Sequence, residues 1–228
     1  MLSILPFCKV HRFDTGINAL AVMFYPLVGA LLGVLLWGFY EIATLVFASS
    51  HAAMMVLALW VLLTGALHLD GFSDTVDALY VDKARAFEVM KDPHVGAMGM
   101  IFTVVLLLIK ASALLHVSDI SLLIAVVMLA RYNAVLLLYN APYLPAWGMA
   151  SLAKTEFKKK HLLWATAMVI ALLLFVNHGP IMLITSLLVA WLCYRFFMRY
   201  YGGFNGDMYG FSIELSEVVL LHCAVVLA

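Results

Sequence analysis

The stretch AAMMVLALWVLLTGALHL, residues 52–69, runs directly into DGFSDTVD, residues 70–77. The first part is apolar almost throughout, and the second carries three aspartates within eight residues. A bilayer core of about 30 Å is crossed by roughly 20 apolar residues in a helix. The first part therefore predicts a membrane span, and the abrupt acidic ending predicts that this span reaches a polar boundary.

The composition of the whole chain agrees with a membrane protein. Its 228 residues are 66% hydrophobic and 11% charged, and the mean hydropathy is +1.06. A soluble domain has roughly half apolar and a quarter charged residues. Lipid must therefore surround much of this chain. Its formal net charge of zero gives no reason to expect a nucleic-acid partner.

Apolar segments of about the length of a span recur along the chain. They predict an all-α fold, a polytopic bundle of about seven transmembrane helices in a single integral membrane domain covering residues 1–228. The first segment contains Pro26, so we expect a kink or a break into two half-helices there. The segments are Ile17–Tyr40, Ala52–Leu69, Gly96–His116, Ile120–Tyr139, Leu162–Val176, Ile181–Tyr201 and Phe211–Ala228.

The basic residues predict the orientation of these segments. With the N-terminus in the cytoplasm, no Lys or Arg falls in the outer connections, and Lys110 and Arg131 fall inside predicted helices. This asymmetry follows the positive-inside rule and predicts a multi-pass protein of the cell (inner) membrane. The inner segments hold the other eleven basic residues: Lys9, Arg12, Lys83, Arg85, Lys91, Lys154, Lys158, Lys159, Lys160, Arg195 and Arg199.

The acidic residues after the second segment begin a long cytoplasmic loop, from Asp70 to about Val95. We expect this loop to be helical, because Asp74–Val89 contains no Gly or Pro, and Pro93 would mark the end of the helix.

The spacing of Asp70, Asp74 and Asp77 is i, i+4 and i+7, which places all three on one face of a helix. Their mutual repulsion near a low-dielectric boundary favours a bound cation, and hard carboxylate ligands suit Mg²⁺. The alternative is a solvated helix face balanced by nearby lysines. His68, beside the cluster, is either a base or ligand or simply a hydrogen-bonded residue at a helix end.

Other polar residues are expected at the same inner face. A glycine-rich turn before the last segment could offer backbone N–H groups to a phosphate, although a flexible connection is the alternative. Carboxylates inside a membrane, here Glu214 and Glu217, are costly and usually functional. Further polar residues that could converge on this face and bind a substrate are Lys91, Asp92, Arg131, Asn133, Asn205 and Gly206, and Asp207 lies in the same glycine-rich turn.

Acidic and basic groups gathered at one membrane face suit transfer of a phosphoryl-linked group, in which a carboxylate or histidine accepts the proton of an incoming hydroxyl. A small cation or metabolite transporter could use the same groups. Their concentration on one face favours an enzyme.

The stretch from Thr64 to Leu79 closely resembles the signature of the cobalamin synthase family, the adenosylcobinamide-GDP ribazoletransferases. The resemblance continues nearly to the end of the chain and in the expected order. It includes Phe24–Gly29, Glu88–Asp92, Gly96–Gly99, Ala130-Arg131, Gly202–Asp207 and Glu214-Leu215.

This resemblance implies a Mg²⁺-dependent reaction that joins adenosylcobinamide-GDP to α-ribazole, or to its 5′-phosphate, and releases GMP. It implies that His68 or an aspartate is the base, and that Lys91 and Arg131 hold phosphate. Homo-oligomerisation stays open. The implied metal ligands are Asp70, Asp74 and Asp77, with Asp207 or a membrane glutamate such as Glu214 as a further ligand.

The sequence departs from the family where Pro93–Gly96 stands in place of a common Ser-Arg-Ile-Gly, and where Asn205 stands in place of a common threonine. CDP-alcohol phosphotransferases also use an aspartate array at a membrane face. Their DxxDGxxAR…GxxxDxxxD pattern is not present, because Gly71 follows the first aspartate and no arginine comes two or three residues later.

Overall fold

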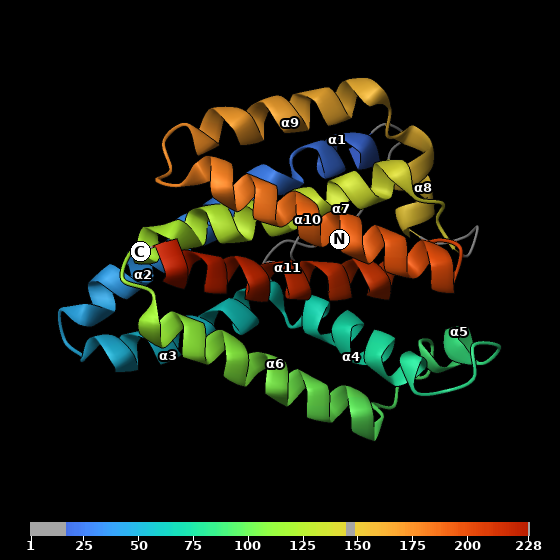
Figure 1. Cartoon of the computed structure of the whole chain (residues 1–228), viewed down its shortest axis with the longest axis horizontal. Helices are drawn as coiled ribbons and strands as arrows, with labels where there is room; N and C mark the ends of the chain where they lie inside the picture. The colour runs from blue at the N-terminus through green and yellow to red at the C-terminus, as the bar shows by residue number, and fades with distance from the viewer. Residues whose placement is uncertain (1–16, 145–148, 228) are drawn as a thin grey trace.

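The computed structural model describes residues 17–144 and 149–227 (Figure 1). Lys9 and Arg12, two of the charges that enter the orientation argument, lie outside these residues. Within them every regular element is a helix, and one isolated parallel bridge joins Tyr143 to Phe204. The elements are α1 (Ile17–Met23), α2 (Tyr25–Thr44), α3 (Ser49–Thr64), α4 (Leu67–Leu79), α5 (Ala86–Val89), α6 (Ala97–His116), η1 (Ile120–Leu122), α7 (Leu123–Asn140), α8 (Met149–Glu156), α9 (Lys159–Leu173), α10 (Gly179–Tyr200) and α11 (Gly206–Leu227).

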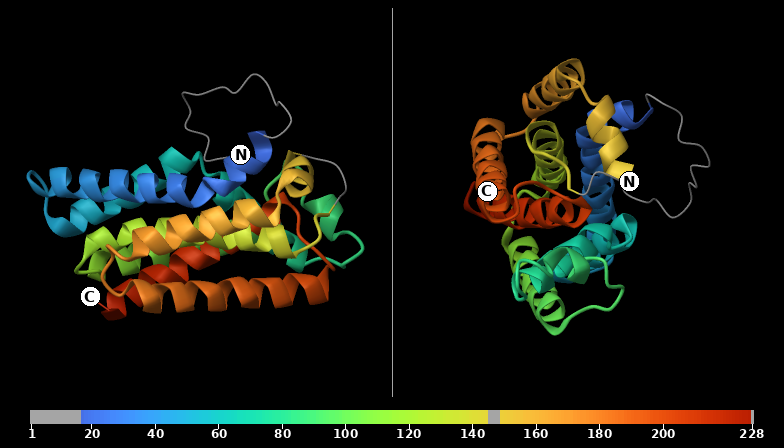
Figure 2. Two further views of the ribbon diagram at one scale, coloured as in Figure 1. Left: turned by 90° about the horizontal axis from the view of Figure 1, so that it is seen from above. Right: turned by 90° about the vertical axis from the view of Figure 1, so that its right-hand side faces the viewer.

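Helix α7 forms the centre of the bundle. In the end-on view of Figure 2 it lies among α2, α9, α10 and α11, all of which it contacts, while α3, α4 and α6 form a second group beside α2 and α11. The span that contains α7 is 83% buried, whereas those of α6 and α10 are 33% buried. The outer faces of α6 and α10 are therefore available to lipid.

Five helices in the described part of the chain are long and apolar enough to cross a membrane: α2, α6, α7 with η1, α10 and α11. The pair α3 and α4 makes a sixth candidate, bent by 85°. The predicted all-α membrane bundle is confirmed. Helix α9 corresponds to the predicted fifth segment, but its 15 residues span only about 22 Å. The count of seven spans stays a prediction.

The predicted break near Pro26 is confirmed. Helix α1 ends at Met23, and α2 begins at Tyr25 with Pro26 in its first turn. A proline is tolerated in the first turn because the N–H groups there have no partner within the helix.

The second predicted span is divided by a sharp turn. Gly65 and Ala66 both adopt left-handed backbone conformations, with φ of 59° and 55°. Two such residues in succession redirect the chain and give the 85° bend. The segment from Asp70 to about Val95, predicted to be helical, is helical in two parts: α4 begins already at Leu67 and ends at Leu79, and α5 covers Ala86–Val89.

Helix α4 lies against α6 and α11 rather than forming part of a loop outside the bundle. Its apolar residues Leu69, Phe72 and Val76 lie on one face and pack with Leu106 of α6. The ring of Phe72 also stacks on Phe211 of α11, with 5.1 Å between the centroids. The aspartates lie on the opposite face, so α4 is an amphipathic helix whose polar face remains accessible.

Candidate active site

The candidate site begins with the polar face of α4. Asp70 is exposed, and Asp74 and Asp77 are half-buried. Asp74 interacts electrostatically with Asp70, Asp77 and also with Asp207 from the first turn of α11. Four carboxylates from two helices therefore share one region, which includes the three predicted from their spacing.

A close crossing of α4 and α11 brings Asp207 to this face. A Cβ atom placed on Gly71 would lie 3.0 Å from both the Cα and the carbonyl oxygen of Asp207, and one placed on Gly210 would lie 3.1 Å from the His68 carbonyl oxygen. Larger side chains at these positions would separate the two helices. The predicted convergence of Asp207 with the α4 aspartates is therefore a consequence of two glycines.

Asn205 orients Asp207 from the turn before α11. The Asn205 Nδ2 donates a hydrogen bond of 3.0 Å to Asp207 Oδ2, and its Oδ1 accepts one of 2.9 Å from the Met208 N–H. The second bond caps the start of α11. Gly206 is exposed, and a Cβ atom there would have no neighbour within 4 Å, so the space above this turn is open.

Asp77 is engaged differently from its neighbours. Its two carboxylate oxygens accept hydrogen bonds of 2.8 Å from the backbone N–H groups of Gly96 and Gly99, at the start of α6. A carboxylate at a helix N-terminus satisfies unpaired donors and interacts favourably with the helix dipole. The structure therefore uses Asp77 to join α4 to α6.

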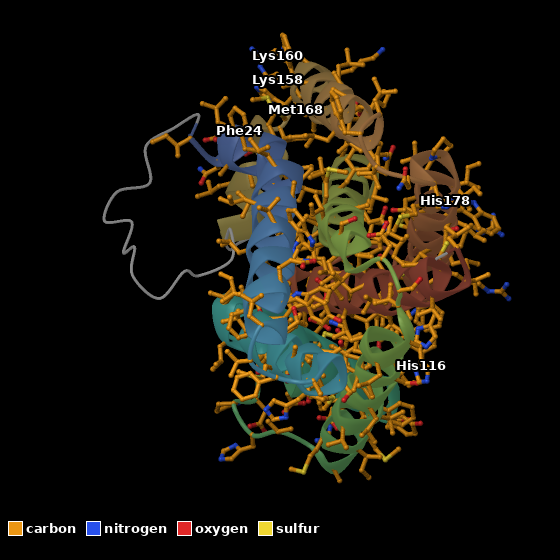
Figure 3. All side chains as sticks on the ribbon, turned by 90° about the vertical axis from the view of Figure 1, so that its left-hand side faces the viewer. Phe24, His116, Lys158, Lys160, Met168 and His178 are labelled. Carbon is orange, nitrogen blue, oxygen red and sulfur yellow. The ribbon has the colours of Figure 1, made fainter. Side chains whose placement is uncertain are left out.

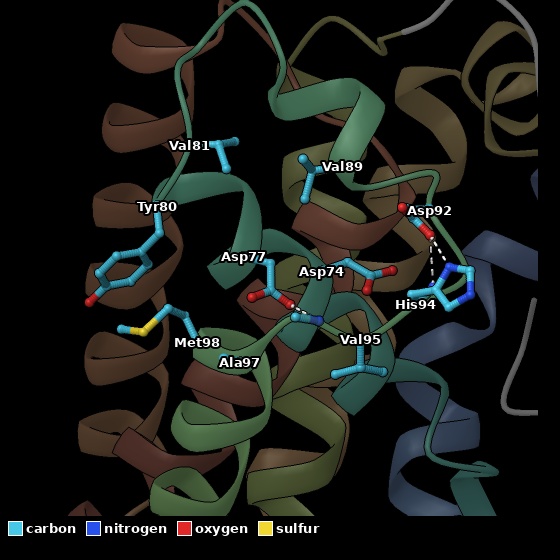
Figure 4. A pocket seen from close by; sticks show the side chains of 11 residues that line it. Asp74, Asp77, Tyr80, Val81, Val89, Asp92, His94, Val95, Ala97 and Met98 are labelled. Carbon is cyan, nitrogen blue, oxygen red and sulfur yellow. Dashed lines mark hydrogen bonds and ion pairs between the residues drawn. The ribbon is translucent and has the colours of Figure 1, made fainter.

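A pocket of about 450 Å³ opens beside these carboxylates (Figure 4). Asp92 at its edge accepts two hydrogen bonds from His94, one from the backbone N–H (2.9 Å) and one at the ring Nδ1 (2.6 Å). These bonds lower the pKa of Asp92 below its usual value. Lys91 is exposed beside Asp92. The pocket is lined by Asp74, Asp77, Tyr80, Val81, Val89, Asp92, His94, Val95, Gly96, Ala97 and Met98.

His68 does not share the aspartate face. It is two residues before Asp70, which on an α-helix corresponds to a rotation of about 200°. His68 is buried, and its Nε2 lies 2.8 Å from the Tyr25 hydroxyl. Its Nδ1 lies 3.5 Å from the guanidinium of Arg131. The structure therefore places two predicted catalytic residues in the bundle interior.

That interior holds a buried charge network that connects α6, α7 and α11. Glu217 forms ion pairs with both Lys110 and Arg131, and Glu214 forms a second ion pair with Lys110. All four residues are nearly or completely buried. Two cations and two carboxylates balance, so the network is neutral as a whole. Glu214, predicted as a metal ligand, is engaged here and not with the aspartates of α4.

Asn133 is also occupied by contacts between helices. Its Nδ2 donates to the Ser186 carbonyl oxygen and to the Ser216 hydroxyl, and its Oδ1 accepts from the Ser186 hydroxyl. Asn133 is completely buried. Within the bundle it joins α7 to α10 and α11, away from the open pocket.

The carboxylates of α4 and α11 are hard oxygen donors of the kind that Mg²⁺ prefers. No three His, Cys, Asp or Glu side chains in residues 17–144 and 149–227 are grouped as a complete metal site. Mg²⁺ is, however, commonly held by one or two carboxylates together with water and substrate phosphates. Asp70, Asp74 and Asp207 supply such carboxylates beside an open space, so these residues fit the ion.

Two roles could not be found from sequence patterns alone. The first is the hydrogen bond of Tyr25 to His68, which no sequence pattern indicates because the two residues are 43 positions apart. Tyr25 is singled out in the sequence only as part of a stretch similar to a known family. The capping role of Asp77 was hidden because the acceptor and its donors are 19 and 22 residues apart. The sequence indicates this role only indirectly: the N-cap of α6 is Gly96 and not a Ser, Thr, Asp or Asn, so the helix needs an acceptor from elsewhere.

Comparison with known proteins adds an independent finding. The sequence profile of the family described as Cobalamin-5-phosphate synthase matches residues 1–225. A protein of Thermosynechococcus vestitus called adenosylcobinamide-GDP ribazoletransferase is 37% identical over 204 residues, which are 88% of this chain and 84% of that protein. Proteins of the same name are 34% identical in Acinetobacter baumannii (92% and 87% covered) and 36% in Brevibacillus brevis (88% and 85% covered). No solved structure matches the chain.

Proposed function

Since this chain belongs to the cobalamin-5-phosphate synthase family, we propose that it joins adenosylcobinamide-GDP to α-ribazole, or to its 5′-phosphate, and releases GMP in a Mg²⁺-dependent reaction. The family itself makes the chain a transferase of late cobalamin biosynthesis. The observation that carries the finer proposal is the convergence of Asp207 from α11 on Asp70 and Asp74 of α4, beside an open pocket.

The reaction exchanges one phosphorus–oxygen bond for another. A hydroxyl oxygen of the ribazole attacks the phosphorus that is attached to cobinamide, and the bond from this phosphorus to the bridging oxygen of GMP breaks. The attacking hydroxyl loses its proton to a base, and GMP leaves with the bridging oxygen. When bound, Mg²⁺ neutralises charge on the phosphate oxygens.

The protein residues divide into two groups in this proposal. Asp70 and Asp207 hold the ion, and Asp74, which lines the pocket, accepts the proton of the hydroxyl. Lys91, exposed at the same edge, attracts the phosphates electrostatically. His68 and Arg131 are positioning residues, because their contacts fix α4 from inside the bundle.

We place the pocket at the cytoplasmic face of the inner membrane. Figure 1 shows α5 and α8 at the same end of the bundle, and the lysines of the connections that contain them are at this end. Figure 3 looks onto the opposite end, where His116 and His178 lie and where the connections contain no Lys or Arg. This distribution supports an orientation in which the basic end faces the cytoplasm.

The proposal is tested with purified protein in lipid nanodiscs. Given Mg²⁺, adenosylcobinamide-GDP and α-ribazole, the protein should release GMP, and Asp74→Asn should lower the rate by about a thousandfold or more. Asp82→Asn, in the exposed loop beyond the pocket, is the matched control and should retain the wild-type rate. Release of GMP at the wild-type rate by Asp74→Asn, or after complete chelation with EDTA, would contradict the proposal.

A further inference from the structure

We propose that Asp77 is a positioning residue that fastens the loop of residues 80–96 over the acidic pocket by capping α6, and that it is not a metal ligand. This inference rests on the proposed function for its meaning in catalysis. The observation that carries it is the pair of 2.8 Å hydrogen bonds from Gly96 and Gly99 to the two oxygens of one carboxylate.

The start of α6 depends on this carboxylate. Helix α6 has 20 residues, and its N-cap, Gly96, has no side chain that could accept a hydrogen bond. The first N–H groups of a helix need acceptors from elsewhere. Asp77 supplies two of them from the last turn of α4, so one side chain fixes the two helices that border the pocket.

The space around Asp77 is shaped for this contact. A Cβ atom on Gly96 or on Gly99 would overlap the Asp77 carboxylate, and one on Gly99 would also overlap the Ser73 hydroxyl. Both glycines are therefore needed for the carboxylate to reach the backbone. With both oxygens used in this way, the Asp77 carboxylate faces α6 and differs from Asp74, for which no hydrogen bond is seen among the described residues.

The loop that Asp77 closes carries one wall of the pocket. Tyr80 and Val81 leave the end of α4, and Asp92 and His94 approach the start of α6. The loop is also held at Met90, which is buried in a cluster with Phe197 and Phe204 and whose sulfur accepts a hydrogen bond from Asn205. Asp77 fixes the remaining end, and with it the distance between Asp92 and the α4 carboxylates.

The function of this contact is to set the shape of the pocket, not to bind the ion. Loss of the contact should loosen residues 91–99 and misplace one wall, which lowers the catalytic rate constant. The affinity for Mg²⁺ should change little, because the ion is held by other carboxylates. A metal ligand would show the reverse pattern.

Three variants separate these roles. Asp77→Ala removes the carboxylate, and Gly99→Ala leaves the carboxylate in place but blocks its approach to the helix. Asp74→Asn is the matched control for an aspartate on the same helix that lines the pocket but, among the described residues, has no hydrogen bond to the start of α6. Amide hydrogen exchange of residues 91–99 is measured for each protein without substrate, and the Mg²⁺ concentration for half-maximal GMP release is measured wherever activity remains.

We expect Asp77→Ala and Gly99→Ala both to accelerate exchange of residues 91–99 by about tenfold, and both to change the half-saturating Mg²⁺ concentration by less than about twofold. Asp74→Asn should leave exchange unchanged. The proposal is overturned if exchange in Asp77→Ala stays at the wild-type rate. It is also overturned if Asp77→Ala, but not Gly99→Ala, raises the half-saturating Mg²⁺ concentration about tenfold. The exchange result does not depend on GMP release, so it stands even if the proposed reaction is wrong.

Discussion

Truncation of Glu217 should destabilise this protein more than truncation of any other carboxylate in its buried network. Glu217 forms ion pairs with Lys110 and Arg131, and none of the three is more than slightly exposed. Glu217→Ala leaves two buried cations with only Glu214 to balance them. The carboxylate is shared between two partners, so one truncation disturbs two ion pairs.

The expected loss of stability follows from the number of ion pairs that each truncation removes, two for Glu217 and one for Glu214. Removal of one member of a buried ion pair costs about 3–5 kcal/mol, because an uncompensated charge is left in a low-dielectric environment. Glu214→Ala is the matched comparison: it leaves the same net charge, but Lys110 and Arg131 both keep a direct ion pair with Glu217, so the loss should be nearer about 1–3 kcal/mol. Against a total stability of about 5–15 kcal/mol, the first loss is large.

The measurement is reversible unfolding in mixed micelles with increasing SDS, followed by tryptophan fluorescence. Adding Lys110→Met to Glu217→Ala leaves Arg131 and Glu214, one charge of each sign, which already interact electrostatically. The double variant should therefore regain about 1 kcal/mol or more relative to the sum of the single losses. The reasoning is refuted if Glu217→Ala unfolds within about 1 kcal/mol of wild type, or if the two losses simply add.

Three further outcomes are expected. Gly71→Ala should force α4 and α11 apart and reduce stability by about 1–3 kcal/mol, whereas Gly38→Ala, whose Cβ would have no neighbour within 4 Å, should be neutral or slightly stabilising in the same unfolding assay. Gly65→Ala should cost about 1 kcal/mol, because φ is 59° there; an unchanged unfolding midpoint would contradict the left-handed turn. His94→Ala should raise the pKa of Asp92, measured by carboxyl ¹³C NMR titration, because the ring hydrogen bond that helps lower it is lost.

Hydropathy along the sequence predicts most of the long helices, but it does not predict how α4 packs. Long apolar runs predict α2, α6, α7, α10 and α11, because each of these helices is apolar along its whole length, whether it faces lipid or the other helices. Hydropathy did not show that α4 packs within the bundle, because its polar face holds three aspartates while Leu69 and Phe72 on the other face are buried. The mean hydropathy over a window of residues does not distinguish one face of a helix from the other. The bend at Gly65 and Ala66 was missed because an alanine gives no sign of a left-handed conformation.

The candidate site was predictable where it depends on a single helix. The spacing of Asp70, Asp74 and Asp77 placed them on one face, and the structure confirms that arrangement. What each carboxylate contacts depends on the other helices. Asp77 meets the start of α6, and Asp207 arrives through the crossing at Gly71, so neither contact is encoded within one local stretch. The partners of the buried charges were hidden for the same reason.

The buried charge network also has a consequence for biosynthesis. Lys110 and Arg131 precede their partners Glu214 and Glu217 by 104 and 86 residues. At about 5–20 residues per second, a ribosome takes on the order of 5–20 s to make the intervening chain. Throughout that interval two cations in the nascent bundle lack the acids that neutralise them. Insertion of α11 therefore completes the charge balance of the bundle, and a chain interrupted before this helix would keep two cations without their carboxylate partners among its helices.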